Sequence, residues 1–326
     1  MQLLFLNPVF KERLWGGTTL KSRFNLSIPS EHTGECWAIS AHKNGETTIK
    51  NGEFAGCGLS KLWRDHPELF ANANELPATS LREFPLLVKI LDANADLSVQ
   101  VHPNDEYAQQ VEGELGKAEC WYILDAKPDA KIVYGHTANS LDEFKQLALS
   151  GKWNELLTTV AVKSGDFFDV PTGTVHAIGA GILILEVQQS SDTTYRLYDY
   201  DRRDDSGQPR ELHLDKSFAV VSIPHRNNLI KPVTTDPINN AILTMLVSNN
   251  NFQVQKLEVF TGFASDDSND NLIYPIKAKY LLVTAIEGNA IINGYAVNKG
   301  DSFIVPNQVR QLEIEGKITL IMSNES

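Results

Sequence analysis

The segment GDFFDVPTGTVHAI (165–178) occurs a second time later in the chain, as GDSFIVPNQVRQLEI (300–314). Both segments begin with the pattern Gly-Asp-x-Phe-x-Val-Pro. In each copy Gly-Asp predicts a turn, the following residues predict a strand, and the proline marks the end of that strand. Because turn residues are common, chance similarity between two hairpins is one explanation. The other is that the chain contains two copies of one barrel type, the second beginning near residue 235.

Short β-rich runs bounded by Gly, Pro, Asn or Asp predominate around the first copy, which favours a sandwich or a barrel. They are ECWAISAH (35–42), FPLLVKILDA (84–93), DLSVQVHP (96–103), ECWYILDA (119–126), GDFFDVP (165–171) and GILILEVQQ (181–189). Two segments instead predict helices, LSKLWRDHPELF (59–70) and SLDEFKQLALSG (140–151). In the second, Ser140 is a natural N-cap with Glu143 three residues later. We therefore expect a mainly β protein with helical insertions.

The chain is long enough for two packed units, because it has 326 residues of which 42% are apolar. We expect a first domain at residues 1–234, with its helical insertions near 59–75 and 139–158. A second β domain is expected at residues 235–326.

Charge and targeting signals restrict the partners. With 29 Lys and Arg against 41 Asp and Glu, the formal net charge is -12, which disfavours nucleic acid and anionic membrane surfaces. The apolar N-terminal run is interrupted by Asn7 and Pro8, and no stretch approaches the roughly 18 apolar residues of a membrane span. We therefore expect a cytoplasmic protein. Its three cysteines, without a CxxC pair, are interpreted as buried free thiols: Cys36, Cys57 and Cys120.

The run DLSVQVHP (96–103) has one polar and one apolar face if it forms a strand. Side chains alternate along a strand, so Ser98, Gln100 and His102 point one way while the leucine and valines point the other. Buried polar groups without partners cost on the order of 1–3 kcal/mol each. A bound metal ion with its waters would satisfy them.

Further ligand types lie on the neighbouring predicted strands. Alternation places Glu119 on one face with Lys117 and Trp121, and His176 lies just after the PTGT turn. Imidazole, carboxylate and amide oxygen together suit Zn²⁺ or a similar divalent ion. At the position matching His176 the second copy has Gln311, so we expect the metal site only in the first copy.

Four separated motifs resemble type I mannose-6-phosphate isomerases, in the shorter form found in bacteria. They are FPLLVKILDANADLSVQVHPND (84–105), GKAECWYIL (116–124), VPTGTVHAIG (170–179) and SSDTTYR (190–196). The similarity extends from RLWGG (13–17) to about residue 220. The resemblance implies a cupin (jelly-roll) barrel, and the repeat then makes the second copy a degenerate cupin-like domain. It also implies one zinc ion per chain, held by Gln100, His102, Glu119 and His176.

The resemblance implies reversible isomerisation of D-mannose 6-phosphate and D-fructose 6-phosphate. This reaction moves a proton between C1 and C2 through an enediol, so it needs a base and an electrophile. Glu186 is the first candidate for the base, because alternation places its charge between apolar neighbours. Its structural alternative is an ion pair with Arg196 or Lys117. Asp192 could instead be the base or accept a hydrogen bond from a sugar hydroxyl. Lys117 could shuttle protons, or it could form a solvent-facing ion pair.

The substrate phosphate requires fixed positive charge, and the resemblance implies that Arg196, Lys89 and Ser98 lie near it. Arginine offers a planar bidentate donor, and lysine a mobile point charge. Lys89 stands among apolar residues of a strand that reads as buried on both faces, which disfavours a solvated role. Arg196, in TTYRLYDYDRR, has the alternative of an ion-paired edge strand.

Three competing functions remain at this stage. A cupin glucose-6-phosphate isomerase would differ only in the configuration of its substrate at C2. An iron-dependent cupin dioxygenase could use the same two histidines and carboxylate. A non-enzymatic sugar-binding cupin would use the fold without the chemistry. The sequence leaves open whether the protein is a monomer or a homodimer.

Overall fold

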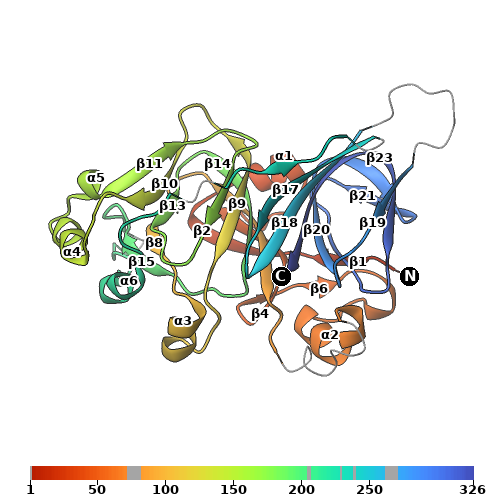
Figure 1. The fold of residues 1–326 in the computed structure, drawn as a ribbon, viewed down its shortest axis with the longest axis horizontal. Helices are drawn as coiled ribbons and strands as arrows, with labels where there is room; N and C mark the ends of the chain where they lie inside the picture. The colour runs from red at the N-terminus through yellow and green to blue at the C-terminus, as the bar shows by residue number, and fades with distance from the viewer. Residues whose placement is uncertain (1, 72–81, 204–206, 228–229, 238–239, 261–270) are drawn as a thin grey trace.

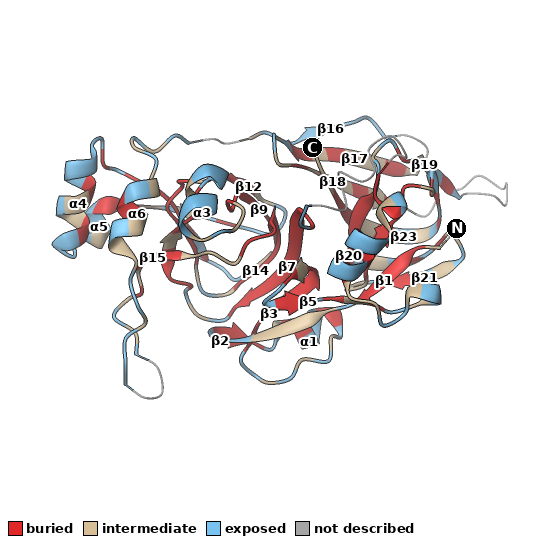
Figure 2. Cartoon of the chain, turned by 90° about the horizontal axis from the view of Figure 1, so that it is seen from below, coloured by how far each residue is buried: buried red, intermediate tan, exposed pale blue. Residues whose placement is uncertain are grey.

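The computed structural model describes residues 2–71, 82–203, 207–227, 230–237, 240–260 and 271–326. Two β bodies lie side by side, and both chain ends lie at the second body (Figure 1). The strands of each body are largely buried, whereas helices α3 and α4 expose much of their surface (Figure 2). Among the described helices, none has the length and apolar character that crossing a membrane requires.

The first body consists of two antiparallel sheets. The six-stranded sheet has the order β12 (Phe167–Val170), β9 (Glu119–Ala126), β14 (Ile182–Gln189), β7 (Leu86–Ala93), β3 (Thr33–Ile39), β2 (Val9–Gly17). The five-stranded sheet has the order β11 (Leu157–Ala161), β10 (Lys131–His136), β13 (His176–Ile178), β8 (Val99–Val101), β15 (Tyr195–Tyr198). Their facing surfaces enclose one apolar cluster that includes Leu97, Trp121, Ile178 and Ile184.

The second body is a ten-stranded sheet. Its main path is β16 (Val233–Thr234), β17 (Ala241–Ser248), β18 (Phe252–Val259), β23 (Gln311–Glu325), β20 (Leu281–Ile292), β22 (Ser302–Val305), β1 (Leu4–Asn7), β6 (Thr48–Ile49). Off this path, β19 (Leu272–Pro275) pairs with β23 and β21 (Tyr295–Asn298) pairs with β20. A small separate pair joins β4 (Ala41–His42) and β5 (Gly45–Glu46). The division at residue 234 stays a prediction, and β1 pairs with β22 across that division.

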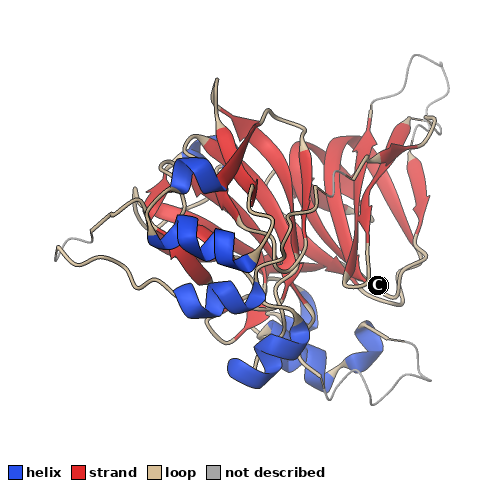
Figure 3. Ribbon diagram, turned by 60° about the vertical axis from the view of Figure 1, so that its left-hand side comes forward, coloured by secondary structure: helices blue, strands red, loops and turns tan. Residues whose placement is uncertain are grey.

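The helices lie in two places: some cover the end of the first body that is remote from the second body, and others lie below the sheets, toward the second body (Figure 1, Figure 3). They are α1 (Thr19–Phe24), η1 (Gly52–Phe54), α2 (Leu59–Asp65), η2 (Pro67–Leu69), α3 (Asp105–Val111), α4 (Leu141–Leu149), α5 (Trp153–Leu156) and α6 (Leu214–Val220). The predicted helical segment at 59–70 contains α2 and η2, and the one at 140–151 contains α4; residues 72–75 lie outside the described part. The outer face of the five-stranded sheet packs against α4 and α6 through Val99, Phe144 and Phe218.

The outer face of the six-stranded sheet packs against the second body. Cys36, Val88 and Val187 from this face share one apolar cluster with Phe252 and Ile321 from the second body. Cys36 and Cys120 are buried free thiols as expected, whereas Cys57 is only half-buried.

The repeat in the sequence is also a repeat of strand order. The order β12-β9-β14-β7 in the first body corresponds to β22-β20-β23-β18 in the second. Gln311 starts β23 as His176 starts β13, but the two residues are not equivalent. His176 is buried, whereas Gln311 is exposed and the buried Leu312 faces inward in its place. The second copy has one extra residue between the Val-Pro pair and the first inward-facing residue of the next strand. Because side chains alternate, this extra residue turns the side chain of Gln311 to the outer face.

Candidate metal centre

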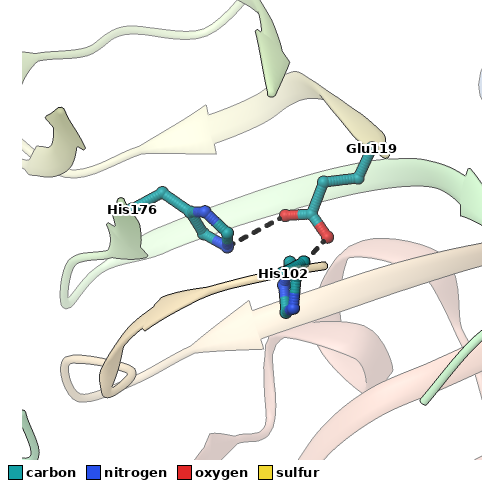
Figure 4. Close-up of side chains that lie close together, drawn as sticks. All are labelled: His102, Glu119 and His176. Atoms are coloured by element: carbon teal, nitrogen blue, oxygen red, sulfur yellow. Dashed lines mark ion pairs between the residues drawn. The ribbon is translucent and has the colours of Figure 1, made fainter. Parts of the chain in front are cut away.

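Three ligand-type side chains converge inside the first body (Figure 4). The candidate ligand atoms of His102, Glu119 and His176 all lie within 4.8 Å of one another. The Nε2 atom of His176 is 3.3 Å from Oε1 of Glu119, and Nε2 of His102 is 3.5 Å from Oε2. Each residue is 1% exposed. A carboxylate and two imidazoles are therefore held together away from water.

Neighbouring strands bring these side chains together. His102 follows directly after β8, Glu119 is the first residue of β9, and His176 is the first residue of β13. The Nδ1 of His176 lies 2.9 Å from the backbone oxygen of Thr174, to which it donates. This hydrogen bond orients the ring, so that the lone pair on Nε2 points toward Glu119.

Burial keeps both imidazoles neutral. It lowers the pKa of His176 to about 4. Burial, and then the positive charge of Lys117, lower the pKa of His102 well below its usual range. Neutral imidazole is the form that binds a metal ion.

The three side chains fit a divalent cation. Nε2 of His176 is buried and has no hydrogen-bond partner among the described residues. Oε2 of Glu119 is also buried, with the ammonium of Lys117 at 3.3 Å and Nε2 of His102 at 3.5 Å. Unpaired buried polar atoms cost about 1–3 kcal/mol each, and a metal ion would satisfy them. Two nitrogens and a carboxylate are common ligands of zinc and of other transition metals.

Gln100 lies beside this group. It pairs with His176 across β8 and β13, so both side chains lie on the same face of the sheet. Val99 and Val101, on either side of Gln100, are buried under the helices on the outer face of the sheet. Gln100 therefore lies on the inward face, where it is half-buried. Its role as a ligand stays a prediction. Ser98 is also buried, but it precedes β8. Leu97 packs in the inner apolar cluster and not with Val99 and Val101, so the alternation predicted for this run is wrong for Leu97.

A row of charged and aromatic side chains crosses the six-stranded sheet next to the three ligands. Trp37, Lys89, Glu186 and Trp121 are direct cross-strand neighbours in that order. The Nζ of Lys89 lies 3.5 Å from Oε1 of Glu186 and 5.0 Å from the centre of the Trp37 ring. The structure therefore pairs Glu186 with Lys89, a partner that the sequence did not indicate.

Trp121 links two carboxylates. Its Nε1 lies 3.0 Å from Oε2 of Glu186 and 3.1 Å from Oε1 of Glu119, so one N–H is shared between them. Burial, and then the negative charge of Glu119, raise the pKa of Glu186. A raised pKa suits a carboxylate that takes and returns a proton near neutral pH.

The other two candidates for the base differ in their surroundings. Lys117 is buried, and its Nζ lies 3.3 Å from Oε2 of Glu119 and 3.2 Å from Nε2 of His102. Burial acts to lower the pKa of Lys117, but the charges of Glu119 and Glu186 raise it overall. Asp192 is half-buried and accepts a hydrogen bond of 2.9 Å from Asn44.

Arg196 lies on the opposite sheet from Lys89. It pairs with Gln100 across β15 and β8, and β15 is the edge strand that the sequence offered as an alternative. Its Nη1 donates to the backbone oxygen of Glu211 at 2.8 Å, whereas its buried Nε has no hydrogen-bond partner among the described residues. Burial, and then the charge of Arg210, lower the pKa of Arg196.

The sequence interpretation missed an ion pair at the far end of this row, between the buried Glu35 and the partly exposed Arg13. Oε1 of Glu35 accepts from Nε of Arg13 at 2.7 Å, and Oε2 accepts from Nε1 of Trp37 at 2.6 Å. Burial acts to raise the pKa of Glu35, but the charges of Lys89 and Arg13 lower it overall. The available signal was the tripeptide Glu-Cys-Trp, which occurs at 35–37 and again at 119–121. In both copies the indole donates to the glutamate two residues earlier.

Two family models match the chain. "Phosphomannose isomerase type I, catalytic domain" matches residues 3–133, and "Mannose-6-phosphate isomerase, cupin domain" matches residues 242–325. The second match confirms the expected cupin fold.

Curated relatives and solved structures agree over the whole length. The mannose-6-phosphate isomerase ManA of Bacillus subtilis is 48% identical over 98% of both chains, and the mannose-6-phosphate isomerase of Streptococcus mutans is 44% identical over 99% of this chain and 98% of that one. A crystal structure of the mannose 6-phosphate isomerase from Bacillus subtilis superposes with a TM-score of 0.91, at 42% identity, over 99% of this chain and 100% of that chain. A putative mannosephosphate isomerase from Archaeoglobus fulgidus, at 21% identity, shares the fold with a TM-score of 0.74 over 100% of this chain and 99% of that one. The chain therefore belongs to the type I mannose-6-phosphate isomerase family.

Proposed function

We propose that the protein interconverts D-mannose 6-phosphate and D-fructose 6-phosphate through an enediol. The observation that supports this most directly is the buried group of His102, Glu119 and His176 with Lys117 and Glu186 beside it. These residues bring metal-binding side chains and titratable groups within hydrogen-bonding distance of one another, and aldose–ketose isomerisation requires both an electrophile and a base.

Gln100, His102, Glu119 and His176 would hold one Zn²⁺ per chain. The ion, when bound, acts as a Lewis acid that polarises the oxygen on C1 or C2 of the sugar. The same ligands also suit iron, so we propose zinc because of the resemblance to the family and not because of the ligands alone.

Glu186 is our first candidate for the base that moves the proton between C1 and C2. The indole of Trp121 holds one carboxylate oxygen and the ammonium of Lys89 lies near the other, which fixes the orientation of the group. Lys117 and Asp192 stay alternatives. Lys117 contacts the metal ligands directly, and the negative charge of Asp192 acts on Lys117 to raise its pKa.

Arg196, Lys89 and Ser98 are our candidates for binding the substrate phosphate. The Nε of Arg196 is buried without a partner among the described residues and can donate to a phosphate oxygen. Lys89 already pairs with Glu186, so a phosphate would compete with that carboxylate for its ammonium. Of the two cations, Arg196 is therefore the better candidate.

We further propose a cytoplasmic enzyme, either a monomer or a homodimer, with its catalytic domain at residues 1–234 and its second cupin domain at 235–326. The formal net charge of -12 supports a partner other than nucleic acid or an anionic membrane.

The test compares the turnover of mannose 6-phosphate and glucose 6-phosphate by zinc-loaded protein, with fructose 6-phosphate formation as the readout. We expect mannose 6-phosphate to be the preferred substrate. Preference for glucose 6-phosphate would overturn the substrate assignment. No turnover of either sugar would favour the sugar-binding cupin, and iron in the purified protein together with oxygen consumption would favour the dioxygenase.

A further inference from the structure

The second β body contains a cavity of about 410 Å³. Strands β17, β18 and β19 form most of its wall, and Leu281 of β20 and Asn324 of β23 complete it. Its apolar lining includes Ala241, Leu243, Leu257, Leu272, Ile276 and Leu281. A cavity of this volume with a mainly apolar wall is in the range of small-molecule sites.

Within the second body, this cavity occupies the position that corresponds to the metal centre of the first body. In the first body Gln100 pairs with His176, and in the second body Tyr274 pairs with the inward-facing Leu312. Tyr274 therefore stands at the place of Gln100. Two residues further along the chain, Ile276 stands at the place of His102.

The remaining equivalences follow from the same pairings. Glu119 pairs with Val170 in the first body, and Leu281 pairs with Val305 in the second, so Leu281 replaces the carboxylate ligand. In the same way Lys89 faces Glu186 across β7 and β14. The corresponding cross-strand pair of β18 and β23 is Gln255 with Met322.

The cavity has thus lost the metal ligands and the buried charges but has kept the space. Four of the equivalent residues line it: Tyr274, Ile276, Leu281 and Gln255. Among the described residues that line it there is no carboxylate or imidazole. The one charged residue among them, Lys277, is exposed to solvent.

The polar groups of the wall are amides and hydroxyls. The hydroxyl of Tyr274 donates to Oε1 of Gln255 at 3.3 Å, which fixes the orientation of that amide. Within the described part of the chain, no residue accepts a hydrogen bond from Nε2 of Gln255. Gln255 can therefore donate to an acceptor on a ligand inside the cavity.

We propose that the C-terminal barrel is a second binding site, which takes an uncharged organic molecule with an apolar body and one hydrogen-bond acceptor. The apolar wall removes the body of the ligand from water, and the amide of Gln255 orients its polar end. A charged ligand would lose its hydration without finding an opposite charge in the interior. The site would be independent of the metal and of the sugar phosphate.

The experiment titrates the full-length protein with N-phenyl-1-naphthylamine, an uncharged fluorescent probe of suitable size. Two variants place a phenylalanine in the cavity, Ala241→Phe inside it and Ala278→Phe at another point of the wall. The matched control is Ala296→Phe, which adds the same side chain on an exposed part of β21. Circular dichroism shows whether each variant is folded.

We expect saturable binding at one site, weakened at least about tenfold by either filling variant and unchanged by the control. A folded wild-type protein that does not bind the probe would overturn the proposal, and so would equal affinity in a folded filling variant. The anionic analogue 1-anilinonaphthalene-8-sulfonate tests the ligand class. Weaker binding of this analogue supports an uncharged ligand, and tighter binding would contradict it.

Discussion

Glu119 is a carboxylate of which 1% is exposed, and its two oxygens face different histidines. Burying a charge is unfavourable unless it is paired or coordinates a metal ion. Lys117 at 3.3 Å supplies one positive charge. A divalent ion would add the compensation that the neutral histidines do not give.

Glu119→Gln should weaken zinc binding by at least the roughly 10–100-fold that loss of an outer-shell partner causes, because it removes a charged ligand. Isomerase activity should fall with it. Zinc content after gel filtration, measured by mass spectrometry, checks the first effect. The control is Glu35→Gln, a buried carboxylate of the same sheet whose partners are Arg13 and Trp37. A Glu119→Gln protein with full zinc content and activity would refute the ligand assignment.

Arg196→Ala should lower kcat/KM for mannose 6-phosphate by roughly 10- to 100-fold, the value of a hydrogen bond to a charged group. The effect should appear mainly in KM, because phosphate is bound equally before and during proton transfer. Steady-state kinetics measure it, with the exposed Arg203→Ala as the control. Unchanged kinetics would remove Arg196 from the phosphate site.

At the scale of single residues, the alternation of side chains along strands predicted which of several site residues face inward. It placed His102 with Gln100, and Glu119 with Trp121, on inward faces. It could not reveal the pairing of Lys89 with Glu186, which are almost a hundred positions apart and meet only through the register of β7 and β14.

At the scale of elements, strong local signals predicted their elements well. The hydroxyl of Ser140 accepts from the backbone of Glu143 at 3.2 Å and caps α4, as the sequence indicated. Helix α3 was missed although Asn104 caps it in the same way, because the helix buries only one residue. Strand β11 was missed because it lies at a sheet edge and none of its residues is buried, so it has no alternating pattern.

A buried carboxylate marks the contact between two elements of different bodies. Oδ1 of Asp169 in β12 accepts a hydrogen bond of 3.4 Å from Asn249, in the turn between β17 and β18. Burial raises the pKa of Asp169 to about 6. The folded state therefore holds this proton more tightly than the unfolded state, whose reference pKa is 3.8.

The stability that this group contributes is fully present below about pH 4 and is lost as the pH rises through about 6. Asp169→Asn removes the charge and should stabilise the protein at pH 8 by about 3 kcal/mol, with a smaller gain at pH 5. Urea unfolding at both pH values measures this difference. The exposed Asp236→Asn serves as the control. An equal effect at the two pH values would contradict the role of this titration.

At the scale of the whole molecule, the repeated Gly-Asp-x-Phe-x-Val-Pro pattern correctly indicated two barrels of one type. It did not indicate how they pack. The contact depends on which apolar face of each sheet remains uncovered, and that face carries Cys36, Val88 and Val187 in the first body. Pairing of β1 with β22 joins the N-terminal strand to the second barrel as well. The two barrels should therefore unfold together.

Leu320→Ala tests this cooperativity. Leu320 is fully buried in the core of the second barrel, so its truncation should cost about 2–5 kcal/mol. All five tryptophans lie between Trp15 and Trp153, but Trp63 packs against Tyr280 of the second body. The measurement is therefore made in a Trp63→Phe background, in which the remaining tryptophans report on the first barrel. If the shared apolar cluster couples the barrels, Leu320→Ala lowers the urea midpoint seen by fluorescence as much as the midpoint seen by circular dichroism. The exposed Ile291→Ala should leave both midpoints in place. A fluorescence midpoint that stays unchanged while circular dichroism shows an earlier transition would mean that the barrels unfold independently.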